Sequence, residues 1–252
     1  MSPIEAVILA GGLGTRLRSV VSDVPKPMAP IGRRPFLEYL LDFWINEGVR
    51  RFVLAVGYKH ESVVEHFGFS YHGIPIDYSI EKEPLGTGGG LFLAFEKILS
   101  DHSFFIINGD TFFPVNASYA LMFHQKKKSK FTMALKEMVT NERYGTIRLT
   151  DDDRINRFCS PGEGDPPYLI NGGVYLANPE FIKEHRQIWN GQSPISSENS
   201  LFPKWIEEGE LIFGFRASGE FIDIGIPEDY KRCHGLFEGK KIKSNSTHSL
   251  RP

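Results

Sequence analysis

The sequence predicts an α/β fold, in which a mostly parallel sheet is sandwiched by helices and is followed by a half with a mixed sheet. Two observations lead to this prediction. Strand-like and helix-like segments alternate up to roughly residue 115, and such alternation requires right-handed crossovers between parallel strands. Beyond that point several strand-like segments follow one another without helices between them, which indicates a mixed arrangement.

The first half opens with a short apolar run, Ile4–Ala10, which is typical of a buried strand and ends at Gly11-Gly12. Pro35–Glu47 has apolar residues at helical spacing and is stopped by Gly48. The same criteria predict further strands at Arg51–Val56, Ile74–Ile80 and Ser103–Ile107, and further helices at Lys59–Phe67 and Gly88–Leu99.

The second half contains a longer series of predicted elements. The expected helices are Asn116–Gln125, Pro179–Glu184, Leu201–Glu208 and Pro227–Phe237. The expected strands are Phe131–Glu137, Gly145–Thr150, Arg154–Phe158, Leu169–Leu176, Leu211–Arg216 and Glu220–Asp223. We therefore expect a single domain over residues 1–239, with halves of about 1–115 and 116–239, and a disordered polar tail over 240–252.

The composition is ordinary for a globular protein and excludes several classes. The 29 basic and 31 acidic residues give a net charge of −2, so nothing indicates a nucleic-acid partner. No apolar run approaches the roughly 20 residues that cross a bilayer, and the N-terminus lacks a signal-peptide pattern. The two cysteines form no CxxC pair, which favours a reducing compartment. We expect a cytoplasmic protein without a membrane partner.

The strongest local signal is the loop Gly11-Gly12-Leu13-Gly14-Thr15-Arg16-Leu17, directly after the first predicted strand. Ligands of open α/β sheets bind beyond the carboxyl ends of the strands, where glycines let backbone N–H groups reach phosphate oxygens. Arg16 adds a guanidinium fork for the same oxygens. The loop is not a Walker A motif, because it has no lysine. It is not a dinucleotide fingerprint either, because Leu17 stands at the third glycine position.

A second segment, Pro25-Lys26-Pro27, follows this loop. We expect the two prolines to hold the lysine in an extended, stiff backbone, from which it can clamp a phosphate. Each segment alone has an ordinary explanation, as a tight turn or a surface lysine. Their succession at this spacing is far more specific and predicts a phosphate site.

These two segments resemble the signature of the sugar-1-phosphate nucleotidyltransferases, G-G-x-G-T-R-L followed by P-K-P. The resemblance covers roughly residues 4–235. Further matching segments are Pro84-Leu85-Gly86-Thr87-Gly88-Gly89, Asn108-Gly109-Asp110, Tyr144-Gly145, Asn171-Gly172-Gly173-Val174-Tyr175 and Asp223-Ile224-Gly225-Ile226-Pro227. The resemblance implies a Rossmann-like, nucleotide-diphospho-sugar transferase fold with a nucleotide-binding first half and a sugar-binding second half. It implies that an NTP and a sugar 1-phosphate give an NDP-sugar and pyrophosphate, and family habit suggests a homodimer.

The resemblance also implies roles for individual residues. Arg16, Lys26 and Asp110 are the expected catalytic residues, the first two as cations that hold the triphosphate. Asp110 and Asp223 are the expected ligands of a Mg²⁺ cofactor, because two carboxylates with phosphate oxygens and water suit this ion. The expected nucleotide-binding residues are Leu9, Gly11, Gly12, Gly14, Thr15, Glu81, Gly86, Thr87 and Gly88. The expected sugar-binding residues are Tyr144, Gly145, Asn171, Gly172 and Tyr175.

Glu81 favours GTP as the nucleotide. It lies five residues before Gly86, in a stretch that faces the nucleobase in this family. A carboxylate only accepts hydrogen bonds, and guanine offers two adjacent donors where uracil and thymine offer one. This stretch resembles the mannose-type guanylyltransferases. The alternative is that Glu81 is a solvated charge at a strand end.

On the sugar side, the stretch Leu13–Ile31, the short chain and the missing C-terminal repeat domain resemble the bacterial guanylyltransferases for D-glycero-α-D-manno-heptose 1-phosphate. The implied product is a GDP-heptose for surface glycan synthesis. Many family members carry Glu-Lys-Pro after the strand Arg154–Phe158, with the lysine on the sugar phosphate. Here Cys159-Ser160-Pro161 follows that strand, so another cation must serve.

Three alternatives stay open from the sequence. The first is a mannose-, glucose- or N-acetylmuramic acid-1-phosphate nucleotidyltransferase that uses GTP, UTP or dTTP. The second is a catalytically silent, nucleotide-binding regulatory subunit, which the absence of Glu-Lys-Pro could suggest. The third is a Rossmann dehydrogenase.

Overall fold

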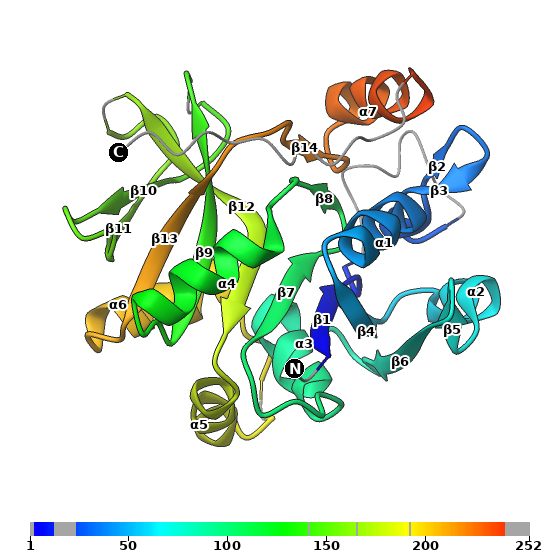
Figure 1. Ribbon diagram of the computed structural model, residues 1–252, viewed down its shortest axis with the longest axis horizontal. Coiled ribbons are helices and arrows are strands. Elements are labelled where there is room, and N and C mark those ends of the chain that lie inside the picture. Colours follow the sequence, from blue (N-terminus) through cyan, green and yellow to red (C-terminus); the bar gives the residue numbers. More distant parts are fainter. Residues whose placement is uncertain (1–2, 13–23, 141, 165, 192, 240–252) are drawn as a thin grey trace.

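The computed structural model describes residues 3–12, 24–140, 142–164, 166–191 and 193–239. In the first half, four strands alternate with three helices. The strands are β1 (Ile4–Leu9), β4 (Val49–Val56), β6 (Ile74–Ile80) and β7 (Phe104–Asn108). The helices are α1 (Phe36–Asn46), α2 (His60–Phe67) and α3 (Gly86–Phe95). The strands lie in the order β7-β1-β4-β6 and are parallel throughout, as Figure 1 shows.

Alternation along β1 explains why helices cover both faces of this sheet. Ala6 and Ile8 pack into one core cluster, together with apolar residues of α1. Val7 points to the opposite face and packs with Leu91 and Phe92 of α3 in a second cluster. A strand that buries both faces is apolar along nearly its whole length, and Ile4–Leu9 is apolar at every position except Glu5, whose carboxylate pairs with Arg51. The predicted sandwich is therefore confirmed.

The second half extends the same sheet with strands in both directions. Its elements are α4 (Ala117–Lys126), β9 (Phe131–Met138), β10 (Thr146–Leu149), β11 (Ile155–Cys159), β12 (Tyr168–Ala177), α5 (Pro179–Trp189), α6 (Phe202–Glu207), β13 (Ile212–Ala217) and α7 (Pro227–Gly239). β12 is antiparallel to β7, β9 and β10, whereas β13 is parallel to β9. Within the described residues the sheet has ten strands. The mixed second half is thus also confirmed.

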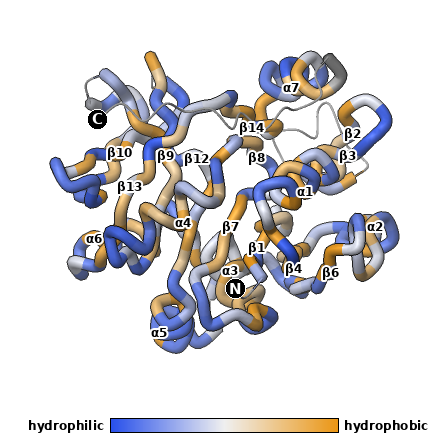
Figure 2. The backbone as a smooth tube through the Cα atoms, in the orientation of Figure 1, coloured by the Kyte–Doolittle hydropathy of each residue, from blue (hydrophilic) through white to orange (hydrophobic). Residues whose placement is uncertain are grey.

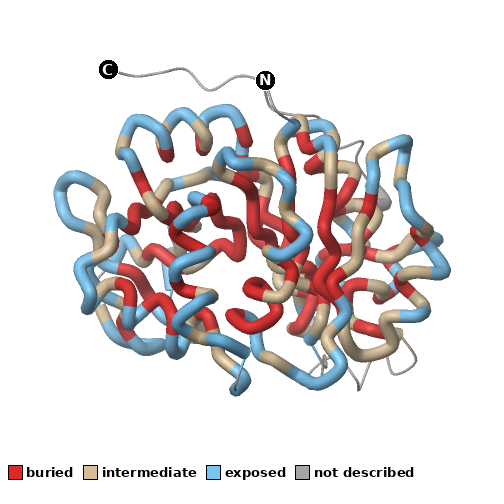
Figure 3. Tube along the Cα trace, turned by 90° about the horizontal axis from the view of Figure 1, so that it is seen from below, coloured by how far each residue is buried: buried red, intermediate tan, exposed pale blue. Residues whose placement is uncertain are grey.

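The helices of this half continue the two layers. Ala117 and Ala120 of α4 belong to the core cluster of α1, and α7 joins the same face through Phe237. Phe181 of α5 and Trp205 of α6 belong to the cluster of α3. Figure 2 shows apolar strands β1 and β7 in the middle and a largely hydrophilic α5 at the edge. Figure 3 shows that buried segments run through the interior of the molecule, whereas exposed segments form the turns at its surface.

Four of the five two-residue strands in the described part of the chain were not predicted, and neither was one irregular helix. The short strands are β2 (Pro30–Ile31), β3 (Arg34–Pro35), β5 (Ser70–Tyr71), β8 (Thr111–Phe112) and β14 (Ile222–Asp223), the last shorter than the strand expected over Glu220–Asp223. A five-residue π-helix, Ser197–Leu201, precedes α6. Helix α3 begins two residues before the predicted Gly88, at Gly86. No helix in the described part of the chain is long and apolar enough to span a membrane.

One local prediction is wrong. Pro25-Lys26-Pro27 was expected to be extended, but Lys26–Met28 forms a single 3₁₀ turn. The N–H of Met28 donates to the carbonyl of Pro25 at 2.8 Å, and the N–H of Ala29 donates to that of Lys26 at 3.0 Å. Pro27 fits because the first turn of a helix leaves its N–H groups unpaired in any case. The predicted tail, 240–252, lies outside the described residues.

Candidate active site

A cleft of about 1090 Å³ lies at the carboxyl ends of the parallel strands. Ligands of open α/β sheets bind at this edge. The predicted site residues that line it are Leu9, Gly11, Gly12, Lys26, Glu81, Gly86, Thr87, Asp110, Tyr144, Gly145, Asn171 and Asp223. Gly88, Gly172 and Tyr175 do not line the cleft. Gly14, Thr15 and Arg16 lie outside the described residues. The cleft thus brings together residues from both halves of the chain.

A short pairing of strands brings Asp110 and Asp223 together from distant parts of the chain. Asp110 lies in the two-residue turn between β7 and β8, and Asp223 is the last residue of β14. β14 pairs with β8 in antiparallel fashion, so that Asp223 lies opposite Thr111. The N–H of Ile224 also donates to the backbone carbonyl of Asp110 at 3.1 Å. The two carboxylates therefore meet at one end of the cleft.

The ammonium group of Lys26 lies between these carboxylates. Its Nζ is 2.6 Å from Asp110 Oδ2 and 3.3 Å from Asp223 Oδ1, and the lysine side chain is only 8% exposed. The N–H of Gly225 donates to Asp223 Oδ1 at 2.8 Å and helps to fix that carboxylate. A Cβ at Gly225 would lie 2.2 Å from the lysine Nζ, so only glycine leaves room for the ammonium group here.

The same oxygens suit a divalent cation. Mg²⁺ prefers hard oxygen ligands and commonly takes one or two carboxylates, with phosphate oxygens and water completing its octahedron. The described residues contain no group of three or more His, Cys, Asp or Glu side chains placed to hold a metal. The donor set of Asp110 and Asp223 therefore fits Mg²⁺ only in company with a phosphorylated ligand.

Glu81 lies at the other end of the cleft, directly after β6. Its Oε2 accepts a hydrogen bond from the N–H of Leu85 at 3.1 Å. A Cβ on Gly11 would lie 2.7 Å from Glu81 Oε1, and a Cβ on Gly90 would lie 2.6 Å from the same atom. The carboxylate thus fits between two glycines, one after β1 and one in α3. Burial raises the pKa of Glu81, and the hydrogen bond from Leu85 opposes this shift.

The matched segment Pro84-Leu85-Gly86-Thr87-Gly88-Gly89 is anchored to the residues before the π-helix. Gly86 has φ +75°, which favours glycine, and its N-terminal neighbour Leu85 accepts a hydrogen bond from the N–H of Ile195 at 2.8 Å. The N–H of Gly88 donates to the carbonyl of Ile195 at 2.9 Å, which places Gly88 behind the cleft wall. Thr87 Oγ1 donates to Glu198 Oε2 at 2.9 Å. This hydrogen bond links the first half of the chain to the second half.

Asn171 is directed into the cleft by an irregularity in β12. The register between β12 and β9 shifts between Asn171 and Tyr175, and such bulges often redirect a side chain next to a site. Asn171 Oδ1 accepts from the N–H of Gly173 at 2.9 Å, and its Nδ2 donates to the Tyr175 hydroxyl at 2.8 Å. Tyr175 is buried and could act on a sugar only by holding Asn171. Gly172 packs against Phe113, behind the cleft.

Tyr144 and Gly145 form the opposite wall. The ring of Tyr144 meets that of Phe221 edge to face, with centroids 5.6 Å apart, and Phe221 lies two residues before Asp223. A Cβ at Gly145 would lie 2.8 Å from the carbonyl oxygen of Cys159. This wall therefore lies against both the segment of Asp223 and the segment Cys159-Ser160-Pro161, all of which line the cleft.

The cleft also contains residues that the sequence did not single out. They are Asn108, Thr111, Arg143, Glu198, Asn199, Phe221 and Gly225, with several apolar side chains between them. Glu198 and Asn199 sit on the π-helix, a rare element that often marks functional sites but has no recognisable sequence pattern. Arg143 adjoins the matched segment Tyr144-Gly145, whereas Asn108 and Gly225 lie inside matched segments but were given no role; these positions could have indicated all three residues.

Comparisons with known proteins agree with this geometry. The family model described as nucleotidyl transferase matches residues 5–238. The chain is 45% identical over 236 residues to a D-glycero-alpha-D-manno-heptose 1-phosphate guanylyltransferase of Aneurinibacillus thermoaerophilus, covering 91% of this chain and 96% of that protein. It is 38% identical over 233 residues to a protein of the same name from Campylobacter jejuni, covering 90% and 97%.

A solved structure is similar over almost the whole chain. It is the crystal structure of HddC from Yersinia pseudotuberculosis complexed with GMP-PN, with a TM-score of 0.77 and 33% sequence identity. The superposition covers 93% of this chain and 99% of that one.

Proposed function

The chain belongs to the nucleotidyl transferase family, and from this premise we propose that it transfers GMP from GTP to D-glycero-α-D-manno-heptose 1-phosphate. The observation that carries the proposal is the arrangement of the cleft. Lys26, Asp110 and Asp223 meet at one end, where phosphates would react, and Glu81 lies at the other end, where a base would bind. The heptose relatives match almost their entire length, which supports the choice of sugar.

The position of Glu81 supports guanine as the base. The N–H of Leu85 uses only one of about four lone-pair positions of the carboxylate, so acceptors remain for the N1–H and N2 amino group of guanine. Uracil and thymine would present a carbonyl oxygen where guanine presents its second donor. A carboxylate fixed between Gly11 and Gly90 cannot turn away from that mismatch. The GMP-PN complex of the HddC structure is consistent with this reading.

The chemistry requires positioning and charge stabilisation. An oxygen of the sugar phosphate attacks the α-phosphorus of GTP, a new P–O bond forms, and the bond to the β-phosphate oxygen breaks to release pyrophosphate. The sugar phosphate is an anionic nucleophile at neutral pH, so no general base is needed. No histidine is among the described residues that line the cleft. Lys26 would stabilise the charge that develops on the transferring phosphate.

We propose that Asp110 and Asp223 hold Mg²⁺ when the nucleotide is bound. The ion would supply positive charge to the phosphate oxygens and orient them for in-line attack. Arg16 and the residues Gly14 and Thr15 are proposed to contact the triphosphate, as their place in the signature implies.

We further assign nucleotide binding to residues up to about 115 and sugar binding to about 116–239, within one domain. Asn171 would hydrogen-bond the sugar while Tyr175 holds its amide in place. Both cysteines in the described part of the chain are free, which supports a reducing compartment such as the cytoplasm. A homodimer and a role in surface glycan synthesis remain predictions from the resemblance.

Pyrophosphate release tests the function directly. The purified protein with Mg²⁺ is assayed with GTP, ATP, UTP and dTTP, each crossed with the manno-heptose, mannose, glucose and N-acetylmuramic acid 1-phosphates. We expect the highest kcat/KM with GTP and the heptose. At least tenfold better use of UTP or dTTP would contradict our assignment of Glu81. A preference for another sugar phosphate would change the proposed sugar and leave the proposed reaction and nucleotide as they are. No pyrophosphate release with any pair would favour a silent regulatory subunit.

A further inference from the structure

The cleft carries an excess of negative charge. Among the described residues that line it, the carboxylates are Glu81, Asp110, Glu198 and Asp223, and the cations are Lys26 and Arg143. Lys26 is already placed between Asp110 and Asp223. A phosphate that enters the sugar side of this cleft therefore needs a further positive partner, because a dianion would otherwise be repelled.

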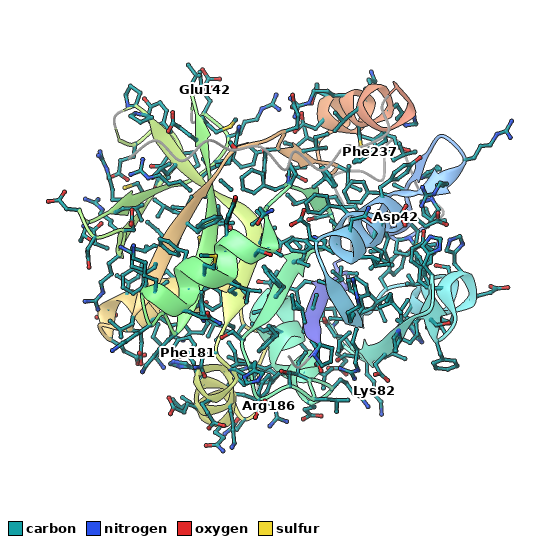
Figure 4. All side chains as sticks on the ribbon, viewed as in Figure 1. Asp42, Lys82, Glu142, Phe181, Arg186 and Phe237 are labelled. Atoms are coloured by element: carbon teal, nitrogen blue, oxygen red, sulfur yellow. The ribbon has the colours of Figure 1, made fainter. Side chains whose placement is uncertain are left out.

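Arg143 is the lining cation for which no carboxylate partner is found in the described part of the chain. Its side chain is exposed, and the cleft wall continues from it into Tyr144 and Gly145. Its acidic neighbour Glu142 does not line the cleft, and Figure 4 shows Glu142 at the outer tip of the molecule. Arg143 therefore faces the cleft with its hydrogen-bond donors available.

The surroundings of Arg143 place it near the reacting end of the cleft. Tyr144 packs edge to face on Phe221, two residues before Asp223. On its other side, Gly145 abuts the carbonyl of Cys159, and Thr146 pairs with Cys159 across β10 and β11. The segment of Arg143 thus lies beside Cys159-Ser160-Pro161, where many members of the family carry Glu-Lys-Pro.

Other cations of this half are engaged elsewhere. Lys136 Nζ donates to the carbonyl of Gly219 at 2.8 Å. Arg157 pairs with Glu163 at 2.7 Å, and neither of these two residues lines the cleft. These contacts leave Arg143 as the cation of the described sugar half that can meet a ligand in the cleft.

We propose that Arg143 binds the phosphate of the sugar 1-phosphate, and so replaces the lysine that this chain lacks after β11. The inference rests on the proposed function. The guanidinium fork can donate two parallel hydrogen bonds to phosphate oxygens, which an ammonium group cannot do. Arg143 thereby holds the nucleophilic phosphate beside the α-phosphorus from the segment that precedes β10, and not from the loop that follows β11.

The test compares the wild-type protein with Arg143→Ala, Arg143→Lys and the matched control Arg157→Ala. KM is measured for the sugar 1-phosphate at saturating GTP and for GTP at saturating sugar 1-phosphate. We expect Arg143→Ala to raise KM for the sugar 1-phosphate at least about 30-fold and to leave KM for GTP within about twofold. Arg143→Lys should recover part of the loss, and Arg157→Ala should behave as the wild type.

Each other outcome has a definite meaning. If Arg143→Ala leaves KM for the sugar 1-phosphate unchanged, or raises both KM values alike with an unchanged melting temperature, the inference is overturned. An equal loss in Arg157→Ala would also overturn it, because the effect would then follow the charge of this half and not contact with the phosphate. Failure of the wild-type protein to turn over any pair would instead overturn the proposed function, and the inference with it.

Discussion

Lys26 Nζ lies 2.6 Å from Asp110 Oδ2, in a position where it competes with any metal ion for that oxygen. The same ammonium group is 3.3 Å from Asp223 Oδ1. The protein without ligands therefore neutralises its two expected metal ligands with its own cation. A triphosphate offers the lysine other oxygens, so metal and nucleotide should bind together. This relationship leads to the first prediction.

Lys26→Met should tighten the binding of Mn²⁺ to the nucleotide-free protein, by roughly tenfold, because the competing cation is removed and two carboxylates lose their partner. It should also lower kcat about 10²-fold or more, because the lysine no longer stabilises the reacting phosphate. Mn²⁺ binding is measured by electron paramagnetic resonance. Lys130→Met is the matched control, since this lysine pairs with Glu210 on the surface. Unchanged Mn²⁺ affinity in Lys26→Met would refute the competition.

Asp110→Asn and Asp223→Asn should each reduce turnover about 10²-fold or more with little loss of folding stability. An amide keeps the shape of the side chain but removes the charge that a divalent cation needs. The loss should be partly offset at high Mg²⁺ concentration, which distinguishes weaker metal binding from a misplaced substrate. Asp77→Asn serves as control, because this carboxylate pairs with Arg51 away from the cleft. A near-normal rate in Asp110→Asn would mean that the site is misplaced.

Acidification should weaken GTP binding through Glu81. Burial raises the pKa of this carboxyl, so it takes up a proton at a higher pH than an ordinary glutamate does. The protonated form loses acceptor capacity toward guanine, and KM for GTP should rise as pH falls through that raised pKa. In Glu81→Gln this rise should vanish, and the preference for GTP over UTP should weaken. KM for UTP, measured over the same pH range, controls for protonation of the phosphates. If KM for GTP depends on pH in the same way in the wild type and in Glu81→Gln, Glu81 does not cause the pH dependence.

The sequence predicted the larger elements because their signals are local. Short apolar runs such as Ile4–Leu9 and the helical spacing of Phe36–Asn46 can be recognised without knowledge of the fold. The meeting of Asp110 and Asp223 was expected only through resemblance. It depends on two strands of two residues each, too short for any periodicity.

Backbone hydrogen bonds and a long-range contact explain which features the sequence analysis missed or mistook. Lys26 adopts a 3₁₀ turn because backbone bonds to Pro25 and Lys26 outweigh the extended preference before a proline. Glu198 reaches the cleft because a π-helix turns it there, and its partner Thr87 is 111 positions away in the sequence. A contact between residues so far apart leaves no signal in the residues beside either partner.

Gly90→Ala should impair GTP use without destabilising the fold. A Cβ at this helical position would lie 2.6 Å from Glu81 Oε1, so the carboxylate must shift, while alanine itself favours the helix by about 1 kcal/mol. We expect KM for GTP to rise roughly tenfold and the melting temperature to stay equal or increase. Gly235→Ala, in the open surface of α7, is the matched control. Unaltered KM for GTP would show that the position of Glu81 is not critical.

A buried histidine in α4 should make stability depend on pH. His124 is 3% exposed, and its Nδ1 contacts Thr132 Oγ1 at 2.8 Å. Thr132 donates its own proton to Ser129 Oγ at 2.9 Å, so Nδ1 must carry the hydrogen of the ring. Burial lowers the pKa of His124 to about 4. The folded protein therefore keeps this imidazole neutral at a pH where the unfolded chain protonates it.

The sign follows from the number of bound protons. Between about pH 6.5 and pH 4 the unfolded state binds more protons at His124, so the free energy of unfolding falls on acidification, by up to about 3 kcal/mol. In His124→Gln this contribution should disappear. Urea unfolding at pH 7.5 and pH 4.5 measures how much stability each protein loses on acidification. The difference between the losses of the wild type and of His124→Gln removes the contribution of the titratable groups that both proteins contain. Equal losses would show that His124 is protonated in the folded state as readily as in the unfolded chain.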